Sequence, residues 1–287
     1  MKTITILWVG LSIMLSPILR AEDHKSPGAA TGIGANATTN NAVAAEESWH
    51  YAISEILMSK YYGTIFGGTF YPGPMSFGDV SASHKSLSGS VTFDLAIGQK
   101  LDRIDQFNRD GGNEYDLTID QTLRFGSKAY PILVDLSLCY LALKDLKDAS
   151  NDAFDESVRF DFPIRADLPS GPIIQPYFQV YHYHMVGDGL RNEGWIGYCG
   201  LIRDQHLGAK LFGSDLILNL DYRMGVNGGV YGSRSGIEYH RLAVSLPIHW
   251  KKWTFVPSII GQTPGGSERT YVHKSEVFGT LFIRRDF

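Results

Sequence analysis

Charged side chains recur at every second position in several stretches of this sequence. Between 114 and 124 the charged and hydroxyl-bearing residues fall on even numbers, and between 155 and 165 most of them fall on odd numbers. Alternate residues of an extended strand share a face, so each stretch would present a row of ionised groups on one side. Acidic and basic residues often stand two positions apart, as Asp221 and Arg223 do. Opposed charges facing a wet channel create a transverse field that orders water and selects small polar or charged solutes.

The alternation places a set of charged residues on these faces. On one interpretation they line a water-filled lumen and set its selectivity. On the other they pair with one another and hold a closed or nearly closed lumen together, and the sequence gives no lumen radius that would separate the two. The residues are Asp94, Asp116, Asp120, Arg124, Asp135, Arg159, Asp161, Arg165, Arg203, Asp221, Arg223 and Arg241.

Two histidines offer a second kind of chemistry. His182 and His184 lie two positions apart, so on a strand they share a face, and such a pair can bind a metal or supply a catalytic base. A lipid hydrolase at the membrane rim would also need a nucleophile and an orienting acid. The spacing places no serine and no third ligand beside the histidines. We therefore expect wall or rim residues, with no enzyme activity, no metal and no cofactor.

The charged residues need regular strands to hold them, and the stretch from Asn113 to Leu143 predicts two. Its first half has apolar residues at most odd positions from 115 to 125, opposite charged and hydroxyl-bearing ones. After Gly126-Ser127-Lys128 the alternation resumes as far as Tyr140. This pattern predicts a long antiparallel hairpin with one apolar and one charged face.

Such strands are longer than the roughly five or six residues typical of soluble sheets, and they match the roughly nine to eleven that cross a bilayer at a tilt. In a soluble sandwich the apolar face would cover a core. In an outer-membrane barrel it faces lipid, the charged face lines the lumen, and aromatic residues mark both ends of the apolar band. The sequence favours an all-β, transmembrane antiparallel barrel of about twelve strands in up-and-down order. The expected interface aromatics are Tyr115, Phe125, Tyr130, Tyr140, Tyr222, Trp250 and Trp253.

The chain begins with a stretch typical of a secretory signal peptide. Lys2 precedes an apolar run, and we expect cleavage after Ala21, with an uncleaved anchor as the alternative. Residues 22–47 are rich in Ala, Gly, Asn and Thr, which predicts a flexible periplasmic leader. Residues 48–287 are left to form the barrel.

The net charge bears on possible binding partners, and the cysteine content bears on disulfide formation. Without Lys2 and Arg20 the chain has 24 basic residues against 30 acidic ones, a net charge near minus six. Nothing in the sequence suggests a nucleic-acid partner. Cys139 and Cys199 are the only two cysteines. We expect both to be unpaired wall residues, although an oxidising compartment would permit a disulfide.

The strand count reaches twelve when Ser48 to Tyr62 is taken as the first strand, although its spacing also fits a helix. An even number suits a bacterial barrel, and so does an alternation of long external loops with short periplasmic turns. The expected loops are 63–73, 100–112, 144–152, 186–193, 225–236 and 262–272, and the turns lie around Lys85, Gly126, Asp167, Gly208 and His249.

The pattern predicts how side chains face on one further strand and leaves the facing of two others open. From Trp195 to about Gln205 we expect lipid-facing Ile196, Tyr198 and Ile202, with Cys199 and Arg203 facing the lumen. The strand at 173–185 has aromatic and histidine residues on both parities, and we favour Phe178 and Val180 outward. The strand at 254–262 is apolar on both faces and its facing stays open.

The chain ends on an aromatic residue. Val277, Leu281 and Ile283 share the parity of Phe287. A terminal aromatic with alternating apolar residues upstream resembles the signal by which the barrel-assembly machinery recognises outer-membrane barrels. We therefore expect the last strand to bind that machinery.

The chain contains three short motifs: Ser59-Lys60-Tyr61, Asn113-Glu114-Tyr115-Asp116 and Ala243-Val244-Ser245-Leu246-Pro247. In these motifs and in its overall pattern the chain resembles the TorF-type family of porins. The resemblance implies a small outer-membrane barrel with a diffusion role.

We therefore expect an exported porin of a Gram-negative outer membrane that passes small hydrophilic solutes passively. Its partners would be membrane lipid, the barrel-assembly machinery and small polar solutes. One alternative is a non-conducting barrel that acts as a surface-binding or structural protein through its external loops. The other is a lipid hydrolase sited at the rim.

Overall fold

The computed structural model describes residues 48–62, 69–71, 73–86, 89–101, 113–144, 152–185, 194–229, 235–265 and 274–287. The expected signal peptide and leader lie outside the described residues, as does most of each expected external loop except 225–236, which is described in part. No helix long and apolar enough to span a bilayer occurs in the part of the chain that the structure describes.

The described residues form antiparallel strands. Most of these strands are ten or more residues long, as the alternating pattern predicts. Their bounds are β1 (Ser48–Met58), β2 (Tyr61–Tyr62), β3 (Thr69–Tyr71), β4 (Met75–Ser86), β5 (Gly89–Lys100), β6 (Asn113–Gly126), β7 (Pro131–Lys144), β8 (Ala153–Asp161), β9 (Gln175–Met185), β10 (Gly194–Leu211), β11 (Ser214–Asn227), β12 (Gly236–Ser245), β13 (Ile248–Trp250), β14 (Trp253–Pro264) and β15 (Glu276–Asp286).

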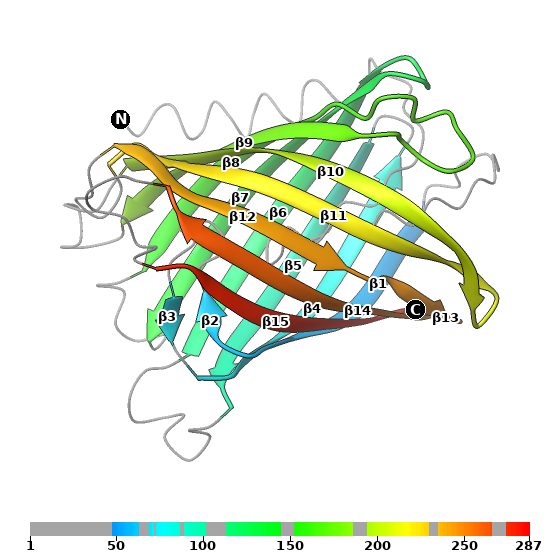
Figure 1. Ribbon diagram of the computed structural model, residues 1–287. Coiled ribbons are helices and arrows are strands. Elements are labelled where there is room, and N and C mark those ends of the chain that lie inside the picture. Colours follow the sequence, from blue (N-terminus) through cyan, green and yellow to red (C-terminus); the bar gives the residue numbers. More distant parts are fainter. Residues whose placement is uncertain are drawn as a thin grey trace.

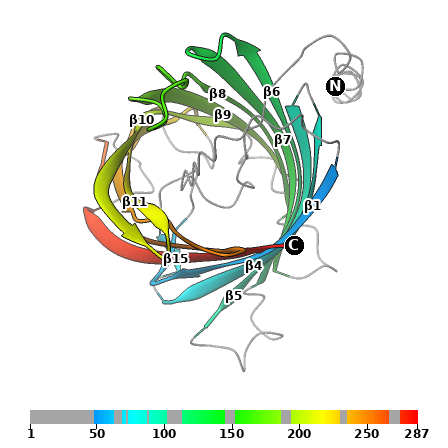
Figure 2. The same ribbon diagram turned by 90° about the vertical axis from the view of Figure 1, so that its right-hand side faces the viewer.

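Twelve of these strands close into a barrel (Figures 1 and 2). Each pairs with the next in sequence, and β1 pairs with β15 to close the ring, with Ala52 opposite Asp286. The short β13 continues the line of β12 and pairs with β14, while β2 and β3 form a separate small hairpin. The predicted fold class, an up-and-down barrel of about twelve strands, is confirmed.

The barrel has two ends, which we call the terminal rim and the far rim. The terminal rim is the end that holds Ser48 and Phe287, where the Phe287 amide donates to the Tyr51 carbonyl over 3.0 Å. The far rim is the opposite end, where β1 finishes at Met58 and β8 begins at Ala153.

The wall alternates as its sequence predicts. On β6, Leu117 and Ile119 are 54% and 43% exposed, whereas Thr118 and Asp120 are 2% and 6% exposed. The apolar parity therefore faces outward, and the polar parity faces the lumen. An outer surface of this kind is stable only against hydrocarbon, and a closed barrel leaves no unpaired strand edge there. Other large apolar side chains exposed on the outer face are Val80, Phe93, Leu95, Ile132, Phe178, Val180, Leu201, Leu242, Ile259 and Val277.

The structure shows the secondary structure of the first segment and the facing of β9 and β14. The first segment is a strand, not a helix, although its main part ends at Met58. On β9, Phe178 and Val180 are exposed on the outside, as we favoured, and Tyr177 is 3% exposed on the inside. On β14, Val256 is fully buried inside and Ile259 is 64% exposed outside. Packing decides these cases because both parities of each sequence are apolar or aromatic.

The predicted facing of β10 is wrong. Ile196, Tyr198 and Ile202 are at most 6% exposed and face the interior, while Cys199 and Arg203 are exposed on the outer face. The same parity brings Gly200 inward, opposite Tyr177 of β9. A Cβ on Gly200 would lie 2.6 Å from the Tyr177 hydroxyl oxygen, so the glycine leaves room for that ring.

Two turns also differ from the prediction. β10 continues past Gly208, which has a φ of 68°, and the chain turns at Phe212 and Gly213, with φ values of 52° and 86°. The hairpin of β10 and β11 is therefore longer than expected. β8 ends at Asp161, so Arg165 lies in the connection to β9, where it has a φ of 57°.

The interior contains two apolar clusters as well as charged groups. One lies on β8 to β10 and the other on β1, β4, β12, β14 and β15. One consists of Ala153, Tyr177, Tyr181, Tyr183, Ile196, Tyr198 and Ile202. The other consists of Ile56, Met58, Met75, Phe77, Ala243, Ile260 and Phe278.

Candidate functional site: the charged lumen wall

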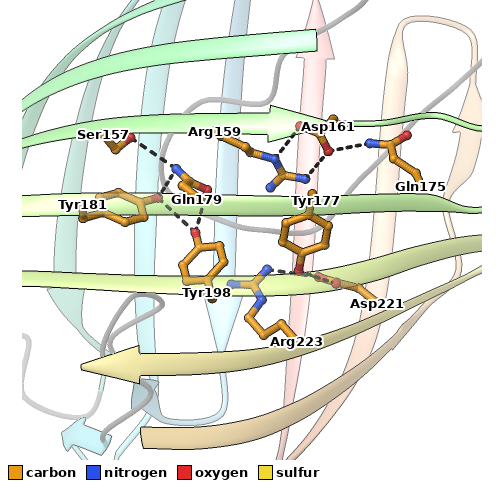
Figure 3. A network of polar contacts seen from close by, with 10 residues as sticks. All are labelled: Ser157, Arg159, Asp161, Gln175, Tyr177, Gln179, Tyr181, Tyr198, Asp221 and Arg223. Carbon is orange, nitrogen blue, oxygen red and sulfur yellow. Dashed lines mark hydrogen bonds and ion pairs between the residues drawn. The ribbon is translucent and has the colours of Figure 1, made fainter. Parts of the chain in front are cut away.

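A chain of polar contacts crosses the inner faces of β8, β9, β10 and β11 (Figure 3). It begins on β8, where Arg159 and Asp161 stand two residues apart and so share the inner face. The Arg159 guanidinium donates to Asp161 from Nε over 2.7 Å and from Nη2 over 2.8 Å. The Gln175 amide of β9 donates to the same carboxylate over 2.7 Å. Asp161 thus accepts three hydrogen bonds at 3% exposure.

Tyr177 links this pair to β11. Its hydroxyl donates to Asp221 over 2.6 Å, and the Arg159 guanidinium lies 4.2 Å from its ring centroid. Arg223 donates to the other oxygen of Asp221 over 3.0 Å and lies 4.5 Å from the ring of Tyr198. Cation–π contacts of desolvated guanidinium groups contribute about 2 kcal/mol. Aromatic rings and carboxylates together therefore hold these two arginines.

A neutral cluster adjoins the charged one. The Tyr198 hydroxyl donates to the Gln179 carbonyl oxygen over 2.8 Å, and the Gln179 amide donates to Tyr181 over 2.6 Å and to Ser157 over 3.2 Å. The two tyrosine hydroxyls are 3.1 Å apart. Every hydroxyl and amide in the cluster has a partner, so this part of the wall is rigid.

Two arginines stand side by side on β11 and β12. Arg223 and Arg241 are register partners, and they are 3% and 4% exposed. Like charges directly opposite each other are unfavourable unless compensated. Asp221 compensates the first, and the Gln262 carbonyl oxygen accepts from Nε and Nη2 of the second over 3.3 and 3.1 Å. With Arg159 they make up what we call the arginine wall, on β8 to β12.

The opposite half of the lumen is acidic. Its carboxylates face inward from four consecutive strands, β4 to β7, and Arg124 of β6 shares their inward parity. Asp79 Oδ2, Asp120 Oδ2 and Asp135 Oδ1 are buried and have no hydrogen-bond partner within the described residues. The acidic wall consists of Asp79, Asp94, Asp116, Asp120 and Asp135.

The structure separates the predicted lumen residues into two groups. Ten have the inward parity of their strands: Asp94, Asp116, Asp120, Arg124, Asp135, Arg159, Asp161, Asp221, Arg223 and Arg241. Arg203 does not, because β10 faces the other way and exposes it outside. Arg165 lies beyond the strand and pairs with Asp167 over 3.0 Å, with 44% of its side chain exposed.

The predicted interface aromatics lie on the outward parity near the rims. Tyr115 and Tyr140 stand towards the far rim, and Tyr140 packs against Phe154 at 5.1 Å between ring centroids. Phe125, Tyr130, Trp250 and Trp253 stand towards the terminal rim, whereas Tyr222 lies further along β11 and contacts His240. Phe287 is 52% exposed, and the Arg285 guanidinium lies 5.0 Å from its ring. The predicted disulfide alternative fails, because both cysteines are free.

Sequence reasoning missed Tyr198 and Asp79. Tyr198 was placed towards lipid because both parities of β10 contain apolar residues. The glycine two positions later was the available signal, because a strand glycine often marks a close approach by another group. Asp79 stands among small residues on β4, where no strong alternation points to its facing.

The comparisons with known proteins leave the family open. No protein-family model and no curated protein sequence matches the chain, so the TorF-type resemblance stays a prediction. Among solved structures, the chain is similar to the outer membrane channel COG4313 from Pseudomonas putida F1, at 9% identity and a TM-score of 0.45, covering 85% of this chain and 97% of that one. It is similar to the translocator domain of the autotransporter NalP from Neisseria meningitidis, at 13% identity and a TM-score of 0.40, covering 84% and 90%.

OccK11 from Pseudomonas aeruginosa is a third similar structure, at 11% identity and a TM-score of 0.38. The alignment covers 82% of this chain but only 63% of OccK11, so this chain spans less than two thirds of that protein. Likenesses at this level carry no argument about function. The pairing of the strands defines the fold, and the side chains of the lumen bear on the function.

Proposed function

We propose that this protein is an outer-membrane porin of a Gram-negative bacterium, through which small hydrophilic solutes diffuse passively. The observation that carries the proposal is the concentration of carboxylates in the lumen. The arginine wall on β8 to β12 is balanced by the buried carboxylates of Asp155, Asp161 and Asp221, whereas the acidic wall on β4 to β7 has an excess of carboxylates that would favour small cations and polar solutes. The lumen side chains need no catalytic step for this role, and the proposal assigns none.

The outer face supports the proposed location. Its exposed residues are apolar along most strands, and aromatic residues stand near both rims, which is the arrangement of a bilayer-spanning barrel. In keeping with that location, we propose that an N-terminal signal peptide directs export and that Phe287 serves the barrel-assembly machinery as a recognition signal.

Planar-bilayer recording tests the proposal. We expect stepwise currents from the purified wild-type protein, with an ion preference visible as a reversal potential under a salt gradient. Asp120→Asn removes one charge from the acidic wall and should shift the reversal potential away from cations. Asp215→Asn is the matched control, because Asp215 pairs with Lys210 beside the turn between β10 and β11, where 59% of the Asp215 side chain is exposed. It should leave the reversal potential unchanged.

One observation favours a second function. The contacts of Figure 3 satisfy much of the inner wall of β8 to β11 internally, which suits a barrel held closed by its own side chains. Such a barrel would be a structural or surface-binding protein that acts through its external loops. Bilayers that contain correctly folded protein and stay silent at all voltages would support this function and rule out the porin.

A further inference from the structure

Three side chains with metal-binding atoms meet on the outside of the barrel. They belong to Glu156 of β8 and to His182 and His184 of β9. His182 Nδ1 is 2.8 Å from His184 Nε2. The Glu156 carboxylate oxygen lies 3.3 Å from His184 Nε2 and 3.7 Å from His182 Nδ1. No other group of three His, Cys, Asp or Glu side chains in the described residues gathers so closely.

The strands explain how the cluster forms. The two histidines share the outward face of β9 because they lie two positions apart. Glu156 is the direct register partner of His182, and side chains of direct partners in antiparallel strands lie about 5 Å apart at Cβ. Each side chain remains between 38% and 45% exposed. The cluster is therefore fixed by the backbone and is accessible from outside.

The Glu156 carboxylate is surrounded by apolar and aromatic side chains. The other outward residues of β8 are apolar: Phe154, Val158 and Phe160. Trp195 of β10, the register partner of His182, is 44% exposed beside the cluster. Glu156 is thus a charged group within an aromatic and apolar surface near the far rim. A charge on the lipid-facing side of a barrel destabilises it unless it lies near the interface or is compensated.

The distances match those between ligands of one small cation. Zinc binds imidazole nitrogen and carboxylate oxygen at about 2.0–2.2 Å in tetrahedral geometry, which places ligand atoms roughly 3.4 Å from each other. The three distances in the cluster bracket that value. A metal ion bound by both imidazoles would replace the contact between their two nitrogens.

We propose that Glu156, His182 and His184 form a binding site for a divalent transition-metal ion on the outer surface of the far rim. Two imidazoles and one carboxylate favour Zn²⁺ over Ca²⁺ or Mg²⁺, which prefer oxygen ligands. The fourth position is open to water or to an anionic oxygen of a lipid headgroup. The site faces away from the lumen, so it does not depend on whether the barrel conducts.

Zn²⁺ titration by calorimetry tests the site on the full-length mature protein, without a histidine tag, in detergent micelles. We expect one Zn²⁺ per chain in the wild type. His182→Ala, His184→Ala and Glu156→Gln should each weaken the affinity at least tenfold, and His182→Ala/His184→Ala should abolish binding. His240→Ala is the matched control, because His240 lies on the same outer face, where it contacts the Tyr222 hydroxyl over 2.9 Å and stacks on the Tyr222 ring. It should leave the affinity unchanged.

Cu²⁺ bound to the wild type gives a second readout, because its electron paramagnetic resonance spectrum should show coupling to two nitrogens. Folding of every variant is verified by the heat-dependent shift in gel mobility of a closed barrel. The proposal is overturned if the wild type binds no Zn²⁺, if the double variant binds as tightly as the wild type, or if His240→Ala loses as much affinity as His182→Ala.

Discussion

Replacing Asp161 by asparagine should destabilise the barrel far more than the same change at Asp167. Each aspartate follows an arginine by two residues and accepts from its Nε, over 2.7 Å from Arg159 and over 3.0 Å from Arg165. The two pairs differ in their surroundings. Asp161 has 4% of its side chain exposed and lies in the lumen wall, whereas Asp167 has 39% exposed in a turn.

The magnitude follows from the bonds that asparagine cannot make. Asp161 accepts two bonds from Arg159 and one from Gln175, and asparagine offers only one carbonyl oxygen and brings an NH2 towards a cation. A charge-assisted hydrogen bond contributes about 1.5–3 kcal/mol, and removal of one member of a buried pair costs about 3–5 kcal/mol. Because the Arg159 side chain is 19% exposed, we expect a loss of about 2–3 kcal/mol. At Asp167, where solvent screens the pair, we expect no measurable change.

The assay is urea unfolding in lipid vesicles, followed by tryptophan fluorescence. The m-value should stay constant and the midpoint should fall for Asp161→Asn only. Arg159→Gln combined with Asp161→Asn should lose less than the sum of the two single changes, because the double variant leaves no uncompensated charge. Equal midpoints for Asp161→Asn and Asp167→Asn would refute the assignment of this pair to the buried wall.

Three further changes test the wall from other sides. Tyr177→Phe removes a 2.6 Å hydrogen bond to a buried carboxylate and should lower the free energy of unfolding by about 1–2 kcal/mol in the same assay. Tyr222→Phe, on the outer face, should lower it far less. Equal losses of stability in the two variants would contradict the buried network. Gly200→Ala places a Cβ 2.4 Å from a carbonyl oxygen, whereas Gly261→Ala meets nothing within 4 Å; only the first should destabilise, by about 1–3 kcal/mol. Leu117→Arg puts a cation on the lipid-facing side and should reduce the yield of folding into vesicles, with a cost in folding free energy of up to about 2–4 kcal/mol. An unchanged folding yield would count against an outward-facing Leu117.

The sequence predicted the fold because the alternation of apolar and charged residues is strict over most strands. On β6 and β11 one parity is apolar and the other is polar, so strand length, facing and lumen residues follow together. The predicted positions of Asp120 and Asp221 on the inner face agree with their exposures of 6% and 3%.

The predicted facing failed on β10, where both parities contain apolar residues. On β10, local hydropathy favoured Tyr198 facing lipid, but its hydroxyl finds Gln179 inside over 2.8 Å, and Arg223 packs over its ring. These partners come from neighbouring strands, and a single strand's pattern contains no information about them. Arg165 failed for a different reason, because the strand ends earlier than its alternation does.

The cluster of Glu156, His182 and His184 shows the same limit. The spacing of His182 and His184 predicted a shared face, which the structure confirms, but gave no third ligand. Glu156 comes from another strand and is brought to His182 by the register of β8 and β9. Sequence alone would have had to supply that register, which depends on the turn length between the two strands.

A label on Cys199 tests most directly whether the outer face of the wall contacts hydrocarbon. Cys199 is exposed, whereas Cys139 is buried. A fluorophore attached to Cys199 in vesicles should be quenched by nitroxides on lipid chains and be insensitive to aqueous iodide. The same fluorophore at Phe212→Cys in a Cys199→Ser background, on a turn residue that is 66% exposed, should show the reverse. Iodide quenching at Cys199 as strong as at position 212 would contradict a barrel whose outer wall lies in the membrane.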